Sequence, residues 1–450
     1  MVGFHSITGK TLLINDLDLV KQIFIKDFDH FVGKGGFTDL GTKSLNAMLF
    51  VLEGETWRET RHASTPVFTS GKLKKMSKLI NKVANDLVVH LEKLSYTGKE
   101  VDARELAFKF TITTIANAGF GIAANAFEDC PQSQQFSKMA KKLTGSDRTY
   151  LETAKLLIGL FMPKLLRKVF GIEVFGDKES VDFFESIINQ RLKMKTDKTK
   201  RNDMVDLFTE TMIGDATKEE ENEEVNGTTD SKVTKLSQMS ADKQELLLKG
   251  NLFAMFFAGM DPPSAMMAAC TYFLAKYPDM QERLFQEIQE ANLNETPDYN
   301  VIMNLQYLEM FVQETMRHNP IVDPLRTCTK EYPVPGTNFT IPVGTAVTLS
   351  AYGIMMDERY FPNPTEFNPE NFSPENKENR NPYTDLGFGI GARKCIGNRF
   401  ALLQFKTGIV NMVQKFVILP TPRLPDKLEL DPQSGSSKVK GGVWVKFEKR

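Results

Sequence analysis

Cys395 lies in a segment whose residue types suit the binding of a metal ion. The segment Phe388-Gly389-Ile390-Gly391-Ala392-Arg393-Lys394-Cys395-Ile396-Gly397 sets the cysteine in a glycine-rich loop that leads directly into a predicted helix. Backbone N–H groups at a helix start stabilise negative charge, and Arg393 adds a positive charge, so both should lower the pKa of the thiol. The glycines permit tight turns and close approach of a flat ligand. We therefore expect a thiolate suited to an iron ligand.

The loop also carries five fixed positions in ten. Phe388, Gly391, Arg393, Cys395 and Gly397 match FxxGxRxCxG, which resembles the haem-binding signature of the cytochrome P-450 family. A cysteine that merely fills a tight turn is the alternative, and the full pattern overrides it. The resemblance implies a mainly α fold with small β-sheets (α+β) in one large domain over residues 1–450. It further implies haem b (iron-protoporphyrin IX) between a central long helix and the cysteine-loop helix, with Cys395 as the iron ligand.

Further matches extend the resemblance over nearly the whole chain. Trp57 and Arg61 match the family's WxxxR, which implies contacts of the indole N–H and the guanidinium with a haem propionate. Arg326 and Arg393 fall where the family places further propionate partners, and the planar donors of arginine suit a carboxylate. Phe388 and Gly397 complete the residues that the resemblance assigns to cofactor binding.

A second pair of motifs concerns the scaffold of the cysteine loop. Glu314 and Arg317 lie one helical turn apart and resemble the family's ExxR ion pair, which implies a structural role beneath the loop. The family's PERF element reads Pro369-Glu370-Asn371-Phe372, so Asn371 stands where an arginine normally joins that pair. The resemblance therefore predicts a scaffold network with one member missing.

The predicted central helix departs from the family pattern at the position where the family has a threonine for proton delivery. It reads Ala258-Gly259-Met260-Asp261-Pro262-Pro263, where relatives have (A/G)GxDT or (A/G)GxET and use the acid and the hydroxyl to deliver protons. Ala258, Gly259 and Asp261 are thus the expected catalytic residues, with Asp261 and a water as the proton route. Pro262 has no hydroxyl, and Ser264 should point away because two residues correspond to about 200° of rotation. We expect slower or uncoupled oxygen activation, and a helix that opens or kinks at the two prolines.

The elements that must position these residues follow from periodicity and breakers. The pattern predicts a strand at 11–14, helices near 17–23, 71–119 and 150–194, and a polar surface loop inserted at 195–246 with an acidic run. Next come a helix at 240–276 interrupted at its prolines, a helix after Pro278, one at 305–317, short strands over 334–349, a helix at 397–414 and a strand-like tail at 441–447.

Composition limits the classes of function. The 450 residues carry 56 Lys and Arg against 57 Asp and Glu, a net charge of −1, which argues against a nucleic-acid partner. The four cysteines form neither a CxxC pair nor a disulfide framework, and no stretch predicts a membrane span. The chain begins at the first strand without the family's N-terminal anchor helix, which suggests truncation, an incomplete gene model or a shortened product.

The resemblance also implies an activity and its partners. It indicates a haem-thiolate monooxygenase of the microsomal type, similar to insect detoxification members, on the cytosolic face of the endoplasmic reticulum. Electrons would come from an NADPH-dependent cytochrome P-450 reductase, with cytochrome b5 as a second partner, and the substrate would be small and lipophilic. The apolar and basic run 156–170 favours membrane-surface contact, with packed helices as the alternative. Two other readings stay open: an isomerase or dehydratase acting on oxygenated substrates, and a non-catalytic haem-binding relic.

Overall fold

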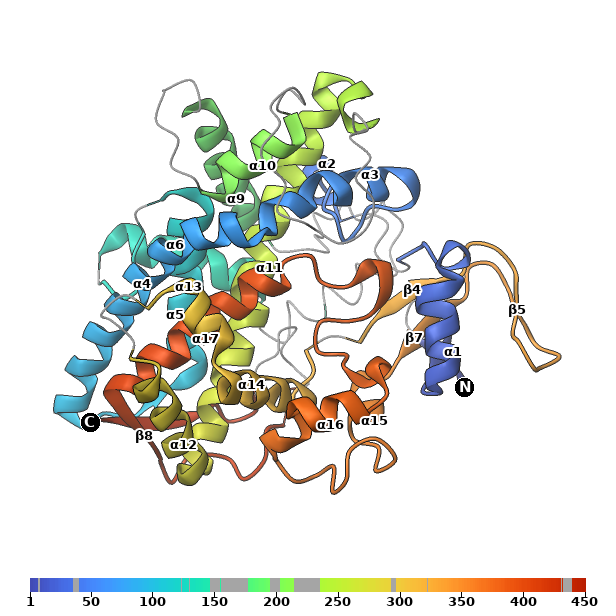
Figure 1. Cartoon of the computed structure of the whole chain (residues 1–450). Helices are drawn as coiled ribbons and strands as arrows, with labels where there is room; N and C mark the ends of the chain where they lie inside the picture. Colours follow the sequence, from blue (N-terminus) through green and yellow to red (C-terminus); the bar gives the residue numbers. More distant parts are fainter. Residues whose placement is uncertain are drawn as a thin grey trace.

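The structure is a computed structural model, mostly helical with small β-sheets at its margins (Figure 1). It describes residues 1–6, 9–34, 40–122, 124–128, 130–145, 154, 177–194, 203–213, 235–292, 297–321, 323–429, 431 and 439–450. This confirms the predicted mainly α fold with small sheets. Among the described residues, no helix is long and apolar enough to cross a membrane.

The described helices are as follows in chain order. They are α1 (Leu17–Lys21), α2 (Lys43–Asn46), α3 (Gly54–Ser64), α4 (Ser70–Thr97), α5 (Ala103–Thr114), α6 (Pro131–Thr144), α9 (Lys178–Lys193), α10 (Met204–Ile213), α11 (Ala241–Lys276), α12 (Pro278–Glu290), α13 (Tyr299–Asn304), α14 (Gln306–His318), α15 (Ala351–Met355), α16 (Pro374–Asn379) and α17 (Asn398–Lys415).

The strands form three small sheets. The first has the order β1 (Val2–Ser6), β2 (Gly9–Ile14), β7 (Ala346–Leu349) and β4 (Leu325–Thr327), and in it β2 and β7 run parallel. The second has the order β3 (Val101–Asp102), β9 (Trp444–Lys449) and β8 (Phe416–Pro420), and the third pairs β5 (Tyr332–Pro333) with β6 (Thr340–Ile341). Both larger sheets join strands that are far apart in the sequence.

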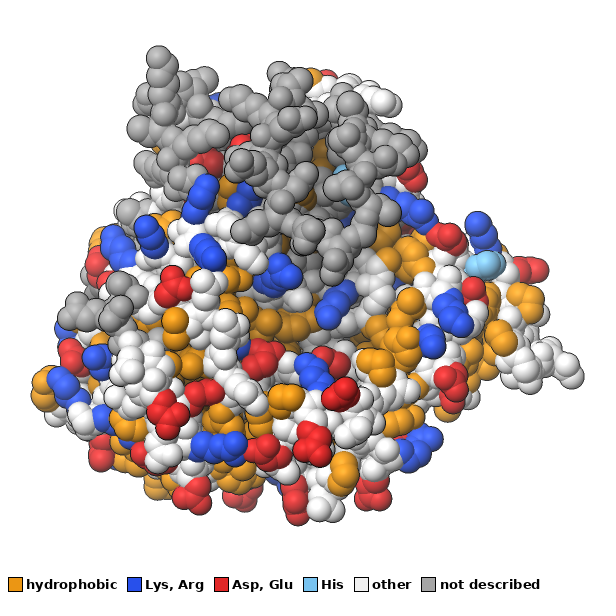
Figure 2. Space-filling model, in the orientation of Figure 1, with side chains coloured by type: hydrophobic (Ala, Val, Ile, Leu, Met, Phe, Trp, Pro, Cys, Tyr) orange, Lys and Arg blue, Asp and Glu red, His pale blue; other side chains and the backbone are white. Residues whose placement is uncertain are grey.

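Helix α11 runs through the middle of the molecule (Figure 1). It is apolar on most sides, as expected for a helix surrounded by others, and it packs on α5, α2, α10, α14 and α17. Gly250 lets it approach α2, because a Cβ there would lie 2.6 Å from the carbonyl carbon of Ala47. On the outside, positive and negative side chains are interspersed over the face shown in Figure 2, in keeping with the balanced net charge.

Helix α11 is not interrupted at Pro262 and Pro263, so that prediction is wrong. The two prolines remove only the N–H donors that would reach the carbonyls of Ala258 and Gly259. Contacts from α5 support the next turn instead: Thr111 Oγ1 donates to Met260 O at 2.9 Å, and Arg104 Nη1 donates to Asp261 O at 3.3 Å. Tertiary packing therefore outweighs the low helix propensity of proline.

Two further predictions on the elements need correction. The predicted helix 71–119 is two elements, because Gly98 ends α4 with φ +60° and the short strand β3 follows. The predicted loop 195–246 contains α10, whose apolar side is buried, and Asp203 just before it is ion-paired with Arg191 at 2.8 Å. The acidic run and most of the segment 150–176 lie outside the described residues.

Most of the other element predictions are confirmed. The strand at 11–14, the helix after Pro278, the helix at 305–317 and the tail strand correspond to β2, α12, α14 and β9. The helix predicted at 397–414 is α17, which begins one residue after Gly397. The segment around Cys395 therefore does lead into a helix start.

Candidate functional site

The cysteine loop is held closed by its own backbone. The N–H of Cys395 donates to Phe388 O at 2.9 Å, and a 3-10 turn at Gly391–Arg393 lies between them. Gly391 has φ +70°, and a Cβ there would lie 2.1 Å from Phe24 O, so only glycine fits. This close approach is between two parts of the chain, whereas the sequence suggested approach of a flat ligand.

The thiol of Cys395 is accessible at the surface and also partly enclosed by the protein. Its surface is exposed, yet the group lies deep enough that burial raises its pKa. The N–H of Gly397 and the positive charges of Arg61, Lys394 and Lys34 act in the opposite direction. The expectation of a lowered pKa is therefore wrong, because desolvation outweighs the helix start and the nearby cations. A metal ion at the sulfur would reverse this balance, since coordination deprotonates a thiol.

Four cationic side chains, Lys34, Arg61, Arg326 and Arg393, lie close together beside Cys395. Arg326 is 3% exposed, and burial together with Arg393 and Arg61 lowers its pKa to about 9. Burial and Arg61 lower the pKa of Arg393 to about 10, against an opposing effect of Glu53. Burial, Arg326 and Arg393 lower the pKa of Lys34 to about 8. Since guanidinium groups stay protonated in proteins, these shifts reflect the burial of several positive charges together without enough negative charge to balance them.

The same cations retain unused hydrogen-bond donors. Arg393 Nη2 donates to Val32 O and Leu52 O at 2.9 Å each, while its Nε and Nη1 have no partner among the described residues. Arg326 Nη2 reaches Ile390 O at 3.4 Å, and its buried Nε is likewise unpartnered there. Buried donors without partners are rare in proteins. A ligand with two carboxylates, such as the propionates of haem, fits both the charge and the free donors.

The ring of Trp57 lies close to two of these arginines. The Arg393 guanidinium is 4.1 Å and the Arg61 guanidinium 6.0 Å from its ring, which is almost fully buried and packs on Phe28. Arg61 Nη2 also donates to Lys394 O at 2.7 Å, so α3 is tied directly to the cysteine loop. The structure thus brings Trp57, Arg61, Arg326 and Arg393 together with Cys395, as the motifs predicted.

Lys34 belongs to this cluster and was not found from the sequence. Its ammonium lies 5.9 Å from the ring of Phe50, and its backbone N–H donates to Glu53 Oε1 at 2.7 Å. The only signal was a lysine among glycines at 33, 35 and 36, which belongs to no recognisable motif.

The Glu314–Arg317 pair is fully buried and doubly hydrogen-bonded. Arg317 Nε and Nη2 each donate to the carboxylate at 2.7 Å, and its Nη1 donates to Met355 O and Pro364 O. Although burial opposes ionisation, the hydrogen bonds of Arg317 and His318 lower the pKa of Glu314. Asn371 Nδ2 also donates to Glu314 at 3.2 Å, so this position keeps one hydrogen bond to the pair.

One face of α11 is solvent-accessible in the middle of an otherwise buried stretch of the helix. Met255, Ala258, Gly259 and Pro262, spaced at i, i+3, i+4 and i+7, retain exposed surface in the middle of this otherwise buried stretch. Gly259 is needed on the other side as well, because a Cβ there would lie 2.3 Å from Ile115 Cδ1. This face is the candidate wall of a ligand space.

Asp261 lies on the α5 side of the helix instead. Its carboxylate is ion-paired with Arg104, and both side chains are about nine-tenths buried. Arg104 also contacts Ser264 Oγ, which donates to Asp261 O at 2.7 Å. Ser264 therefore points away from the Pro262 side, as predicted, while the carboxylate expected on a proton route is already engaged by an arginine.

Apolar residues of α11 and of the segment before α3 that could line a substrate pocket divide into two groups. Met48, Leu49 and Phe256 belong to the core, where Phe256 stacks on Phe120 with 3.5 Å between ring centroids. Phe50 and Phe257 are partly exposed, and Phe37 lies outside the described residues.

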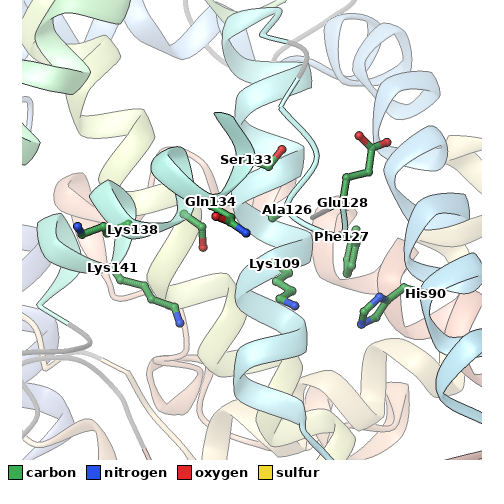
Figure 3. A pocket seen from close by; sticks show the side chains of 10 residues that line it. His90, Lys109, Ala126, Phe127, Glu128, Ser133, Gln134, Lys138 and Lys141 are labelled. Atoms are coloured by element: carbon green, nitrogen blue, oxygen red, sulfur yellow. The ribbon is translucent and has the colours of Figure 1, made fainter. Parts of the chain in front are cut away.

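A separate hollow opens between α4, α5 and α6 (Figure 3). It measures about 600 Å³ and is lined by His90, Phe127, Glu128 and the lysines 109, 138 and 141. Burial and the charges of Lys109 and Lys93 lower the pKa of His90. The hollow contains none of the residues of the cysteine-loop site, and we assign it no function.

Comparison with known proteins agrees with these features. The cytochrome P450 family model matches residues 1–443. The chain is 31% identical to cytochrome P450 6B6 of Helicoverpa armigera, over 99% of this chain and 84% of that protein. It is 30% identical to cytochrome P450 6B1 of Papilio polyxenes (100% and 86%) and 31% identical to cytochrome P450 9e2 of Blattella germanica (100% and 85%). The protein thus resembles insect detoxification types and belongs to the cytochrome P450 family, whose members are haem-thiolate monooxygenases with protoporphyrin IX haem iron as cofactor.

Proposed function

We propose that the protein inserts one oxygen atom from O2 into a small lipophilic substrate, while the second oxygen leaves as water with two electrons from NADPH. The observation that carries this proposal is the group of four cations, Lys34, Arg61, Arg326 and Arg393, beside the thiol of Cys395. Haem supplies the oxygen activation when it is bound. Arg326 and Arg393 would hold its propionates with their free N–H groups, together with Trp57 and Arg61.

Residues of the cysteine loop would prepare the iron ligand. The N–H of Gly397 donates toward the sulfur of Cys395 and stabilises its negative charge, as do Arg61 and Lys34. Phe388 closes the loop through its carbonyl, which accepts from the N–H of Cys395. These residues therefore orient the sulfur and oppose the effect of burial on its pKa, and coordination to iron would complete its deprotonation.

The solvent-accessible face of α11 would form the opposite wall, for oxygen and substrate. Ala258 and Gly259 leave room there, and Met255 offers an apolar surface to a lipophilic molecule. We keep Asp261, reached through water, as the acid of the proton route. Its pairing with Arg104 and the missing hydroxyl at Pro262 support inefficient proton delivery, with part of the reducing power lost as peroxide.

Pro262 also favours a second candidate activity. Rearrangement or dehydration of an already oxygenated substrate needs the haem iron but not proton delivery from a hydroxyl at this position. A haem-binding protein without turnover is the remaining reading. Product that depends on a reductase separates the monooxygenase from both, and turnover without a reductase separates the other two.

The partners follow from the family and from surface charge. We propose an NADPH-dependent cytochrome P-450 reductase as electron donor, with cytochrome b5 as a second one, at the cytosolic face of the endoplasmic reticulum and with membrane-surface contact. Lys74, Lys75, Lys394 and Arg399 are exposed on the side of the cysteine loop. The start of α4 lies near this loop, since a Cβ on Gly397 would be 3.6 Å from Phe68. An acidic docking face on the reductase would complement them.

The deciding experiment is the carbon monoxide difference spectrum of the reduced, haem-loaded protein, compared with Cys395→Ser. We expect the band of a thiolate-ligated haem, lost in the variant. A correctly folded protein without this band would refute the proposal. NADPH consumption, product and peroxide measured with reductase then distinguish the monooxygenase from the alternatives.

A further inference from the structure

Arg380 lies where the Glu314–Arg317 pair meets the chain that leads into the cysteine loop. Its guanidinium is 4.4 Å from the ring of Phe361 and 4.7 Å from that of Phe372. The guanidinium of Arg317 is 5.0 Å from the same Phe361 ring, which is fully buried. One buried aromatic ring is therefore shared by two arginines.

The polar contacts of Arg380 point in two directions. Its Nη1 donates to the carbonyl of Asn371, the residue whose side chain reaches Glu314. Its Nε donates to Thr384 Oγ1 at 3.2 Å, and Thr384 is buried. Arg380 thus joins the carboxylate network of α14 to the start of the segment 384–395.

Charge explains why a cation is tolerated at this half-buried place. Burial lowers the pKa of Arg380, the negative charges of Asp385 and Glu314 raise it, and Arg317 lowers it further. Asn371 contributes only a neutral amide to Glu314, so the second guanidinium within electrostatic reach of that carboxylate is Arg380. The net charge around Glu314 therefore depends on Arg380 as well as on the side chain at position 371.

Displacement at Thr384 would be transmitted to the sulfur. Gly387 packs against Met316 of α14, because a Cβ there would lie 2.8 Å from Met316 Sδ. Gly389 N donates to Leu386 O, and Cys395 N donates to Phe388 O, both at 2.9 Å. The stretch from Thr384 to Cys395 is therefore a series of short contacts with little freedom to absorb a shift.

We propose that Arg380 is a positioning residue that anchors the cysteine loop to the Glu314–Arg317 pair and supplies, from position 380, the second guanidinium that position 371 lacks. The inference rests on the proposed role of Cys395 as the haem ligand.

The test compares Arg380→Ile with the parent protein in haem-loaded form. We expect haem release to become about tenfold faster, the order of effect of losing one buried guanidinium with its ring and hydrogen-bond contacts. Part of the carbon monoxide band should move away from the thiolate position. Adding Asn371→Arg should recover part of both readouts, because it returns a guanidinium to Glu314 but not the hydrogen bond to Thr384. Arg359→Ile is the matched control, since Arg359 is exposed and contacts only Asp357 and Tyr360 in the described structure.

Three outcomes would overturn the proposal: release within twofold of the parent in Arg380→Ile, equal effects in Arg359→Ile, or no rescue by Asn371→Arg. If Arg380→Ile does not fold, Thr384→Val keeps the arginine and removes its Nε acceptor, together with the hydrogen bond from Thr384 Oγ1 to Asn381 O. Faster haem release in Thr384→Val supports the anchor, and unchanged release refutes it. If the parent protein itself lacks the carbon monoxide band of a thiolate-ligated haem, the proposed function is refuted instead. Urea unfolding of the haem-free variants, with and without Asn371→Arg, then still tests the anchor.

Discussion

Lys34→Met should change the haem-free and haem-loaded proteins in opposite directions. In the haem-free protein, burial and the charges of Arg326 and Arg393 lower the pKa of this ammonium from 10.5 to about 8. A shift of about two to three units corresponds to a cost of about 3 kcal/mol for keeping this charge near neutral pH, as an upper bound. Methionine has a similar length and no charge, so the variant should raise the free energy of unfolding by about 1–3 kcal/mol.

In the haem-loaded protein, Lys34→Met should weaken the binding of haem instead, because a haem propionate would balance the Lys34 ammonium. Removal of one such charge-assisted contact should speed haem release by about tenfold. The assays are urea unfolding of the haem-free protein and transfer of haem to an acceptor protein. Lys394→Met, at an exposed lysine of the cysteine loop, is the control and should leave unfolding nearly unchanged. Destabilisation of the haem-free variant, or unchanged haem release, would refute the account of the site as a cationic pocket that lacks two carboxylates.

Three other substitutions test the surrounding structure. Arg104→Leu should lower the free energy of unfolding by about 3–5 kcal/mol, since it leaves the buried carboxylate of Asp261 unpaired. It should also speed amide exchange at Ser264–Met267. The control Arg191→Leu breaks a comparable pair with Asp203 and should destabilise the protein without faster exchange at Ser264–Met267. Identical exchange in both variants would contradict the idea that α5 supports α11 at its prolines. Glu314 has a pKa below the ordinary 4.5. Its ionised form therefore contributes stability that is present above about pH 4.5 and is lost as the pH falls through the lower pKa of the folded state. Glu314→Gln should be less stable at pH 7 and should lose this part of the acid sensitivity, and an unchanged slope of stability against pH would rule out the assignment. Pro262→Thr should increase product per NADPH and decrease peroxide without changing the carbon monoxide band, whereas equal coupling in both proteins would show that this position does not limit proton delivery.

The fold and much of the site could be predicted because short motifs carry strong geometric demands. Five positions around Cys395 identified the loop, and the structure brings it together with Trp57, Arg61 and Arg326. Periodicity located α12, α14 and α17 because their apolar faces are regular. These features depend on local spacing, which a sequence displays directly.

What could not be predicted depends on contacts between distant segments. The pKa of Cys395 is set mainly by burial, which no local pattern reveals. The continuity of α11 through two prolines depends on Arg104 and Thr111 of another helix. Lys34 joins the cationic cluster from a segment with no motif, and Arg380 reaches the Glu314 network from outside the PENF element. In each case tertiary contacts override or extend the local signal.

The parallel pairing of β2 with β7 determines when β2 can be paired during synthesis on the ribosome. Residues 11–14 of β2 bond to residues 346–349, so β2 has no partner on this side until most of the chain has been made. At about 5–20 residues per second, this interval is on the order of half a minute. Strand β3 waits even longer, because its partner β9 ends at residue 449. The nascent protein therefore exposes unpaired strand edges for most of its translation, and chaperones that cover such edges should determine how much of it matures.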